Sequence, residues 1–168
     1  GNALRSNQTA ASTTSCNVNS FTTTGFTLDS AGGGEINANS VTEVAWTFRK
    51  ATNFFDVVTY TGTGIARTIA HNLGSTPGCI IVKRTDAASQ WFVYHNGLTS
   101  AAYYVTLNTT DQQVSNAGVW NSTAPTSSVF SVGVSSNTNA SGGTYVAYLF
   151  AHDTTSTGLI QCGSFTTD

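Results

Sequence analysis

Charge is scarce in this sequence. Only 8% of its 168 residues are Asp, Glu, Lys or Arg, against roughly 25% in an ordinary soluble domain. The net charge of −2 provides no basic surface of the kind that captures nucleic acid. No apolar run approaches the ~18 residues that a membrane-spanning helix needs. We therefore expect no nucleic-acid partner and no membrane span.

Cysteine is also rare. The sequence has three, Cys16, Cys79 and Cys162. An odd number cannot pair completely, and no two of them have the close spacing of a metal site, so we interpret them as buried free thiols. The three histidines are scattered as well, and we expect neither a metal nor another cofactor. Asp29, beside a glycine-rich loop, leaves calcium binding open as an alternative.

Threonine, serine and asparagine supply the polarity instead, with 29, 19 and 14 residues. Threonine favours strands, whereas asparagine, serine and the 16 glycines favour turns. Apolar patterns of strand type recur between turn signals, and no useful window has helical periodicity. The sequence predicts an all-β protein, an antiparallel β-sandwich of the jelly-roll or concanavalin-like type.

Nine segments have strand patterns. They are residues 43–50, 54–62, 67–74, 79–86, 91–97, 103–110, 129–136, 144–153 and 159–168. Only a short polar turn separates residues 79–86 from residues 91–97, so we predict that these two strands form a hairpin.

One stretch of the sequence occurs twice. Residues 37–51 and 139–153 match in register at positions 102 apart. The identical pairs are Asn37 and Asn139, Ala38 and Ala140, Val44 and Val146, Ala45 and Ala147, and Phe48 and Phe150. The similarity continues on both sides with small shifts, and it places Phe26 over Phe130 and Tyr60 over Phe165. The sequence therefore predicts a tandem repeat of about 103 residues.

The repeat suggests a division of the chain. Residues 1–51 would be the C-terminal half of one unit, residues 52–153 a complete β-sandwich unit, and residues 154–168 the start of another. An equally permissible division treats the whole chain as one pseudo-symmetric sandwich. Residues 20–62 and 124–165 would then be equivalent strands of its two sheets.

The two repeated strands carry the same alternating apolar residues. They are Val44, Trp46 and Phe48 in one strand, and Val146, Tyr148 and Phe150 in the other. Because side chains two apart share a face of a strand, we expect both sets to occupy equivalent inward positions. Burial of each side chain would contribute roughly 1.5–3 kcal/mol.

The motif HNLGSTPG, residues 71–78, predicts a structural turn. Gly74 would supply an unusual φ, Asn72 would bond to its own backbone, and Pro77 would begin a second turn. His71 opens the motif. As an alternative, His71 and Asn72 could hold a ligand through their hydrogen-bonding groups.

The predicted hairpin carries the candidate ligand-binding residues. They are Arg84 and Asp86 at the end of its first strand, and Trp91, Tyr94 and His95 on its second. Aromatic faces beside hydrogen-bonding side chains are typical of sugar-binding sites. The alternative is an ordinary hairpin whose Trp91 packs into the core.

No residue set predicts catalysis. A glycosidase needs two carboxylates across a cleft, but the repeat places Gly133, not an acid, at the position of Asp29. The G-x-S-x-G motif of a serine nucleophile is missing as well. We expect that the protein is not an enzyme.

Several stretches resemble repeated units of long structural proteins in tailed bacteriophages, especially marine ones. They are VAWTFRKA, FFDVVTYTGTG, HNLGSTPGCIIVKRTD, WFVYHNG and NASGGTYVAYLFAH, and the resemblance covers residues 2–168. It implies a non-enzymatic structural or adhesive module of a tail fibre or other virion appendage, and it supplies no catalytic residues. The implied partners are further copies of the chain, other virion proteins and a host-surface glycan.

Two alternative functions remain open. The first is a carbohydrate-binding domain that recognises a host receptor. The second is a subunit of an extracellular filament, in which end segments complete neighbouring chains by strand exchange.

Overall fold

The computed structural model describes residues 2–14, 18–29 and 36–167, and antiparallel strands dominate it. The strands are β1 (Val18–Phe21), β2 (Phe26–Leu28), β3 (Phe55–Thr61), β4 (Arg67–Ala70), β5 (Pro77–Arg84), β6 (Phe92–His95), β7 (Tyr103–Thr106), β8 (Val114–Ser115), β9 (Val129–Val132) and β10 (Thr144–Ala151). The helices α1 (Ala117–Trp120) and α2 (Ser136–Asn139) are single turns. The predicted all-β, antiparallel fold class is confirmed.

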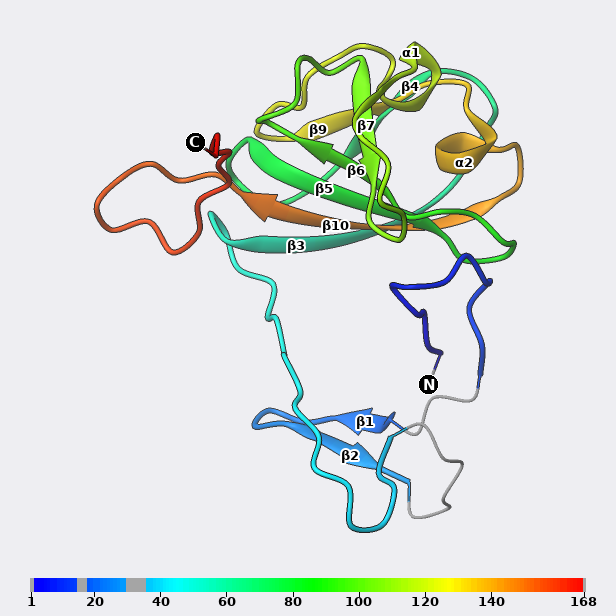
Figure 1. Cartoon of the computed structure of the whole chain (residues 1–168), viewed down its shortest axis with the longest axis vertical. Helices are drawn as coiled ribbons and strands as arrows, with labels where there is room; N and C mark the ends of the chain where they lie inside the picture. The colour runs from blue at the N-terminus through cyan, green and yellow to red at the C-terminus, as the bar shows by residue number, and fades with distance from the viewer. Residues whose placement is uncertain (1, 15–17, 30–35, 168) are drawn as a thin grey trace.

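The main sheet has six strands in the order β3-β10-β5-β6-β7-β8 (Figure 1). Strand β10 lies between β3 and β5, and its register with β3 runs from Thr144 opposite Thr61 to Phe150 opposite Phe55. A central strand is covered on both faces, which explains why residues 145–151 are almost continuously apolar. The predicted hairpin of β5 and β6 is present, with Ile80 opposite Tyr94.

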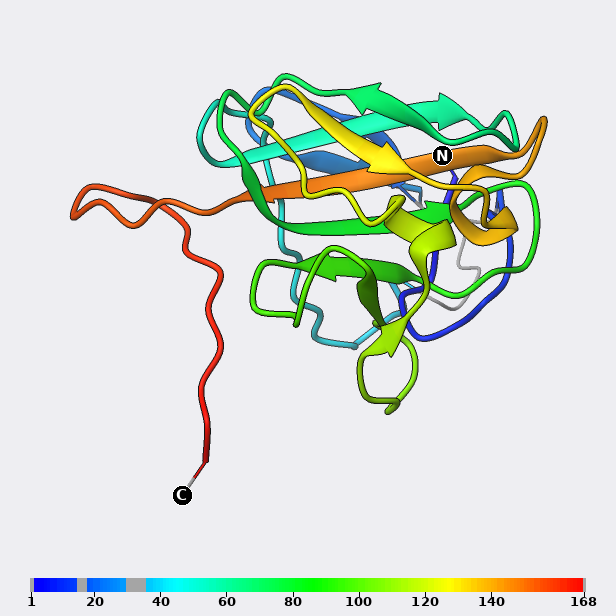
Figure 2. The same cartoon turned by 90° about the horizontal axis from the view of Figure 1, so that it is seen from above.

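A second layer covers one face of this sheet, which we call the core face. It consists of the two-stranded sheet β4-β9 together with α1 and α2, seen nearest the viewer in Figure 2. The core between the layers includes Leu73, Ile80, Val82, Val119, Trp120, Phe130, Val132, Tyr145 and Leu149. Each of these side chains is at most 2% exposed.

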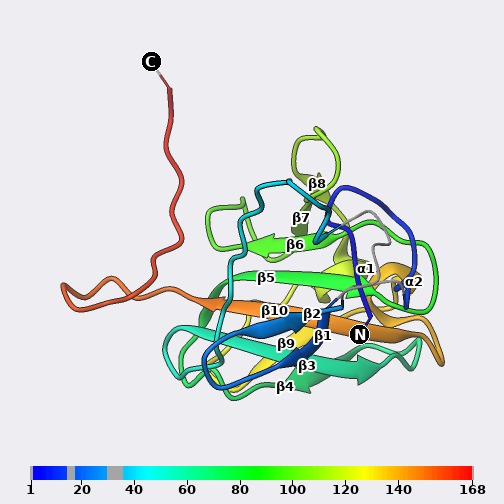
Figure 3. The same ribbon diagram turned by 90° about the horizontal axis from the view of Figure 1, so that it is seen from below.

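The opposite face of the sheet, the outer face, is covered differently. The hairpin of β1 and β2 lies beneath it, separate from the body in Figure 1 and in front of β3 and β10 in Figure 3. Residues 41–50 have no strand structure and lead from the region of the β1–β2 hairpin towards β3. We call this stretch the strap. The N-terminal residues 5–12 contact the body separately, at the end of β5.

The expectation of a strand at residues 43–50 is wrong. The strap is not paired in a sheet, and its Val44, Trp46 and Phe48 are 80%, 83% and 47% exposed. A two-residue alternation identifies a possible strand, but a strand also needs neighbours to accept its hydrogen bonds. The expected strand at residues 159–168 is also not a strand over its described part, residues 159–167. Ile160 packs against the core and Cys162 contacts the body, and the end of the chain projects beyond them in Figure 2.

The expected orientation of β10 is also wrong. Its core-facing residues are Tyr145, Ala147, Leu149 and Ala151, and the alternate set is on the outer face. There Val146 is buried, whereas Tyr148 and Phe150 are half-buried. Because both faces of a central strand are apolar, alternation alone cannot identify the face that meets the core.

Candidate functional site

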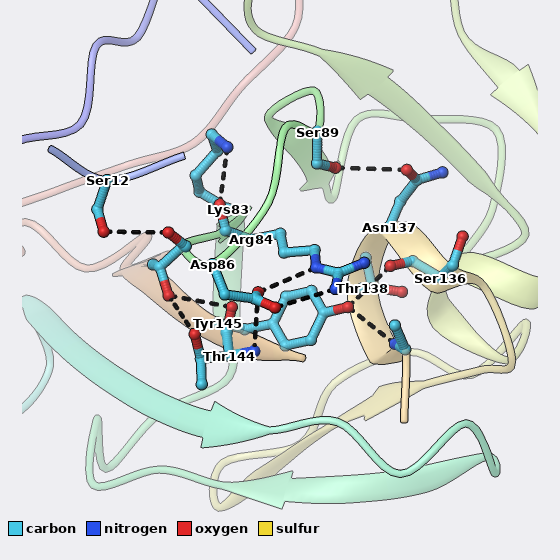
Figure 4. A network of polar contacts seen from close by, with 12 residues as sticks. Ser12, Lys83, Arg84, Asp86, Ser89, Ser136, Asn137, Thr138, Thr144 and Tyr145 are labelled. Atoms are coloured by element: carbon cyan, nitrogen blue, oxygen red, sulfur yellow. Dashed lines mark hydrogen bonds and ion pairs between the residues drawn. The ribbon is translucent and has the colours of Figure 1, made fainter. Parts of the chain in front are cut away.

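An ion pair stands at the end of β5 (Figure 4). The Arg84 guanidinium donates two hydrogen bonds of 3.0 Å to the Asp86 carboxylate, and Asp86 also accepts a 3.0 Å bond from the backbone N–H of Thr144. The hydrogen bonds from Arg84 hold the pKa of Asp86 well below its usual range. The pair therefore ties the loop after β5 to the start of β10.

Tyr145 lies beside this ion pair and is 1% exposed. Its hydroxyl donates to the carbonyl oxygen of Ser136 and accepts from the N–H of Ala140, both at 2.8 Å. Tyr60 stacks on its ring at 5.0 Å and donates to the carbonyl oxygen of Thr138 at 2.7 Å. Burial raises the pKa of both tyrosines. These contacts hold α2 on the core face.

Asn139 is completely buried at the end of α2. Its amide nitrogen donates to the carbonyl oxygens of Ile65 at 2.8 Å and Gly133 at 2.7 Å, and its amide oxygen accepts from Thr63 N–H at 2.9 Å. One side chain thereby joins three loop segments. We did not predict this role from the sequence, although the repetition of Asn37 as Asn139 was a usable signal.

The N-terminal segment is fastened by two side chains of the body. Lys83 is fully buried, and its Nζ donates to the carbonyl oxygens of Arg84 at 2.7 Å and Thr9 at 3.2 Å. Burial lowers the pKa of Lys83. The indole N–H of Trp91 donates to the carbonyl oxygens of Arg5 and Gln8, each at 3.1 Å.

The five candidate ligand-binding residues do not come together. Arg84 and Asp86 form the ion pair, and Trp91 lies at the same end of the hairpin but is only 6% exposed. Tyr94 belongs to the core, 9% exposed and edge-on to Trp120. His95 stands opposite Cys79, five residues from Arg84 or roughly 16 Å along the strand.

The motif of residues 71–78 forms a turn between β4 and β5. Gly74 has a φ of 77°, which a residue with a side chain rarely adopts, and Pro77 is the first residue of β5. The His71 ring, rather than the Asn72 side chain, accepts the local backbone hydrogen bond, from Leu73 N–H at 3.3 Å. Burial lowers the pKa of His71.

Asp56 of β3 anchors this turn to the main sheet. Its carboxylate accepts from Asn72 N–H at 2.8 Å and lies 3.0 Å from the Lys50 ammonium at the end of the strap. Burial alone would raise the pKa of Asp56, but the hydrogen bonds from Asn72, Lys50 and Val57 outweigh it and lower the pKa.

Cys79 and Cys162 are half-buried free thiols, and Cys16 lies outside the described residues. Burial, and to a smaller extent the proximity of Cys162, raises the pKa of the Cys79 thiol to about 12. A nucleophilic cysteine needs its thiolate near neutral pH, so this environment disfavours reactivity at Cys79.

An open apolar cleft of about 760 Å³ lies between the outer face, the strap and the hairpin of β1 and β2. Its lining includes Phe21, Phe26, Trp46, Phe48, Tyr148 and Phe150. Phe48 meets Phe150 edge-on at 5.9 Å, and Tyr148 stacks with Trp91 at 6.3 Å. Trp46, one of its lining residues, is 83% exposed.

The described residues gather no group of three His, Cys, Asp or Glu side chains suited to a metal ion. Among these residues, no helix has the length and apolar character needed to cross a membrane.

A comparison with protein families matches residues 1–168 to a model described as a domain of unknown function, DUF7483. Comparisons with curated proteins and with solved structures found no match.

Proposed function

We propose that this chain, which belongs to the DUF7483 family along residues 1–168, is a non-enzymatic structural and adhesive module of a virion appendage such as a phage tail fibre. Its location would be the outside of the particle. Its partners would be other virion proteins, further copies of itself and a host-surface glycan. The resemblance of its motifs to repeated units of phage structural proteins motivates the assignment.

One structural observation carries the proposal. The polar and aromatic side chains most suited to bind a ligand are engaged in holding separate segments of the chain together. Asp86 is bonded by Arg84 and Thr144, and the Trp91 indole is bonded by the N-terminal segment. At these residues, this use favours a scaffold over a sugar site.

The architecture supports two further parts of the proposal. The main sheet with the β4-β9 layer over its core face would be a β-sandwich, with residues 52–153 as its unit. One hydrogen bond occurs in both copies of the repeat. Asn37 Nδ2 donates to the carbonyl oxygen of Asp29, and Asn139 Nδ2 donates to the carbonyl oxygen of Gly133. Residues 1–51 and 154–168 would then belong to neighbouring units.

Quantitative mass spectrometry of purified virions, combined with gold-labelled antibodies in electron microscopy, tests the assignment. We expect the chain in the particles at stoichiometric copy number, with label on an external appendage. A chain that is abundant in infected cells but missing from purified particles would refute the proposal. A glycan-binding screen of the purified chain, with Trp46→Ala at an 83% exposed aromatic side chain as the comparison, tests the adhesive part separately.

A further inference from the structure

We infer that residues 43–50 of one copy of this chain pair as a β-strand with residues 159–165 of a second copy, in the register that β10 has with β3. The inference rests on the proposed structural function and deepens it, because it names the partner and the surface. Its evidence is the repeat, the exposure of both segments and the strand pairing seen within the body.

Residues 43–50 have the sequence of a sheet strand but no sheet. They repeat the sequence of β10, which hydrogen-bonds to β3 on one side and to β5 on the other. In the described part of the chain, no strand pairs with the strap in this way. Val44 and Trp46 expose 80% and 83% of their surface. An apolar, unpaired strand of this kind favours association with another chain.

One side-chain hydrogen bond of the turn that leads into the strap has a counterpart in the body. Asn37 donates to the Asp29 carbonyl oxygen at 3.0 Å, and Asn139, just before β10, donates to the Gly133 carbonyl oxygen at 2.7 Å. In the sequence repeat, Asn37 is equivalent to Asn139, and Asp29 is equivalent to Gly133. The parallel is confined to this hydrogen bond, because Asn37 has a φ of 66° whereas Asn139 is the last residue of α2.

Residues 159–165 have the matching character. They repeat residues 54–60, which contain most of β3, with Ile160 at the position of Phe55 and Phe165 at that of Tyr60. Leu159 and Phe165 are 79% and 90% exposed. The described part of each chain therefore carries one unpaired segment similar in sequence to β10 and one similar to β3.

The pairing of β10 with β3 fixes the expected register between copies. Tyr148 stands opposite Val57 and Phe150 opposite Phe55, so Trp46 would stand opposite Cys162 and Phe48 opposite Ile160. Residues directly opposite share a face of an antiparallel pair, so these apolar side chains would cover one another.

The same rule places Val44 opposite Ser164, because Val146 stands opposite Thr59. The only ionisable side chains in the two segments are Glu43, Arg49, Lys50 and Cys162, so no like-charged pair opposes the contact.

A second copy fits better than the same chain. In Figure 1 the strap descends below the sheet, whereas the C-terminal end stays at the level of the body. The C-terminal segment is held on its own body by the packing of Ile160 against the core and by single hydrogen bonds, such as Asp153 N–H to Ile160 O at 3.0 Å and Cys162 N–H to the His152 ring at 3.1 Å. Exchange would replace these contacts with a strand ladder. Contacts of this head-to-tail type join copies into a closed ring or an open filament.

Disulfide trapping between two different variants tests the register. In a background with all cysteines replaced by serine, one chain carries Val44→Cys and the other carries Ser164→Cys. We expect that mixing them at micromolar concentration with oxidised glutathione gives the mixed covalent dimer several-fold above either homodimer. Phe165→Cys in place of Ser164→Cys is the matched control, because its side chain points to the other face.

Equal trapping at residues 164 and 165, or no mixed dimer, would overturn the inference. So would a double variant, Val44→Cys with Ser164→Cys, that closes only within one chain at every concentration. Circular dichroism of the cysteine-free background establishes that it folds before these yields are compared.

A second measurement needs no cysteine variant. Trp46 is the exposed tryptophan, because Trp91 and Trp120 are 6% and 2% exposed. We expect the fluorescence to shift to shorter wavelength as concentration rises, together with a growing mass in light scattering.

Trp46→Asp should weaken association at least about tenfold, or ~1.4 kcal/mol. Ile65→Asp, at a 72% exposed site on a different loop, should leave association unchanged. A mass and emission that stay constant across concentrations, or equal effects of the two variants, would refute the inference.

The two proposals can fail separately. If the chain is present in virions but monomeric in these measurements, the proposed function stands and the strand pairing is refuted. If the chain pairs in this register but is missing from virions, the strand pairing stands and the proposed function is refuted.

Discussion

Asn139→Ala is the substitution whose cost the structure predicts most directly. The side chain is completely buried and makes three hydrogen bonds of 2.7–2.9 Å, with Ile65, Gly133 and Thr63. Alanine would leave three backbone groups without this partner, and a buried group that loses its partner costs about 1–3 kcal/mol. Because the loops can relax towards water, we expect a total loss of about 3–5 kcal/mol in the free energy of unfolding.

The repeat provides a matched control, Asn37→Ala. Asn37 occupies the equivalent position and makes the equivalent bond to a carbonyl oxygen, but its side chain is exposed. Water can replace an exposed partner, but the φ of 66° at Asn37 is costly for alanine, so we expect a loss of about 1–2 kcal/mol, which is still below that of Asn139→Ala. The comparison therefore separates burial from residue type.

Urea unfolding at neutral pH, followed by circular dichroism and tryptophan fluorescence, measures both variants. Asn139→Asp adds a third point, because it keeps the acceptor and removes the two donors. We expect the losses to rank Asn139→Ala and Asn139→Asp well above Asn37→Ala. Equal losses for Asn139→Ala and Asn37→Ala would show that the buried amide does not hold the three loops together.

Three further predictions concern the body. Gly133→Ala would place a Cβ 2.3 Å from the carbonyl oxygen of Gly118, so we expect a Tm drop of several degrees, and an unchanged Tm would show that the backbones can separate freely. Lys83→Met removes a buried charge at similar volume but leaves the carbonyl oxygens of Thr9 and Arg84 without this donor, so urea unfolding should show a loss of about 1–3 kcal/mol, and an unchanged stability would show that removal of the charge offsets the lost bonds. Hydrogen bonds from Arg84 lower the pKa of Asp86 below 3.8, so its charge stabilises the fold above that pH and this contribution is lost as the pH falls. Asp86→Asn should therefore flatten the fall of Tm on acidification below about pH 4, and an unchanged slope would rule out this contribution.

The sequence was sufficient to predict the fold class and most strands of the body. Six predicted segments contain β3, β4, β6, β7, β9 and β10, and a seventh, residues 79–86, overlaps β5, because their apolar residues meet other apolar strands of the same chain. The strap has an equally good pattern but remains unpaired, since a pattern does not reveal whether the neighbouring strands are present. The face of β10 could not be predicted because Tyr145 and Tyr148 are equally plausible core residues.

The candidate site was predictable only in part. Arg84 and Asp86 are two residues apart, so their contact is local and follows from the sequence. The burial of Trp91 depends on carbonyl oxygens more than 80 positions away, at Arg5 and Gln8, and no local pattern indicates such a contact. The role of Asn139 is equally non-local, because it joins Thr63 and Ile65 to Gly133.

The position of β10 has a consequence for the order of folding. Strand β3 is synthesised long before β10, yet β10 lies between β3 and β5 in the finished sheet. Neither β3 nor β5 can form its final pairing with β10 until synthesis reaches residue 151, some 90 residues after β3 ends. Non-local pairing of this kind slows folding, because loop closure must precede the contacts that stabilise it. During translation, the apolar edge of β5 therefore stays unpaired until the last strand of the body emerges, which makes this interval the period of greatest exposure to misassembly.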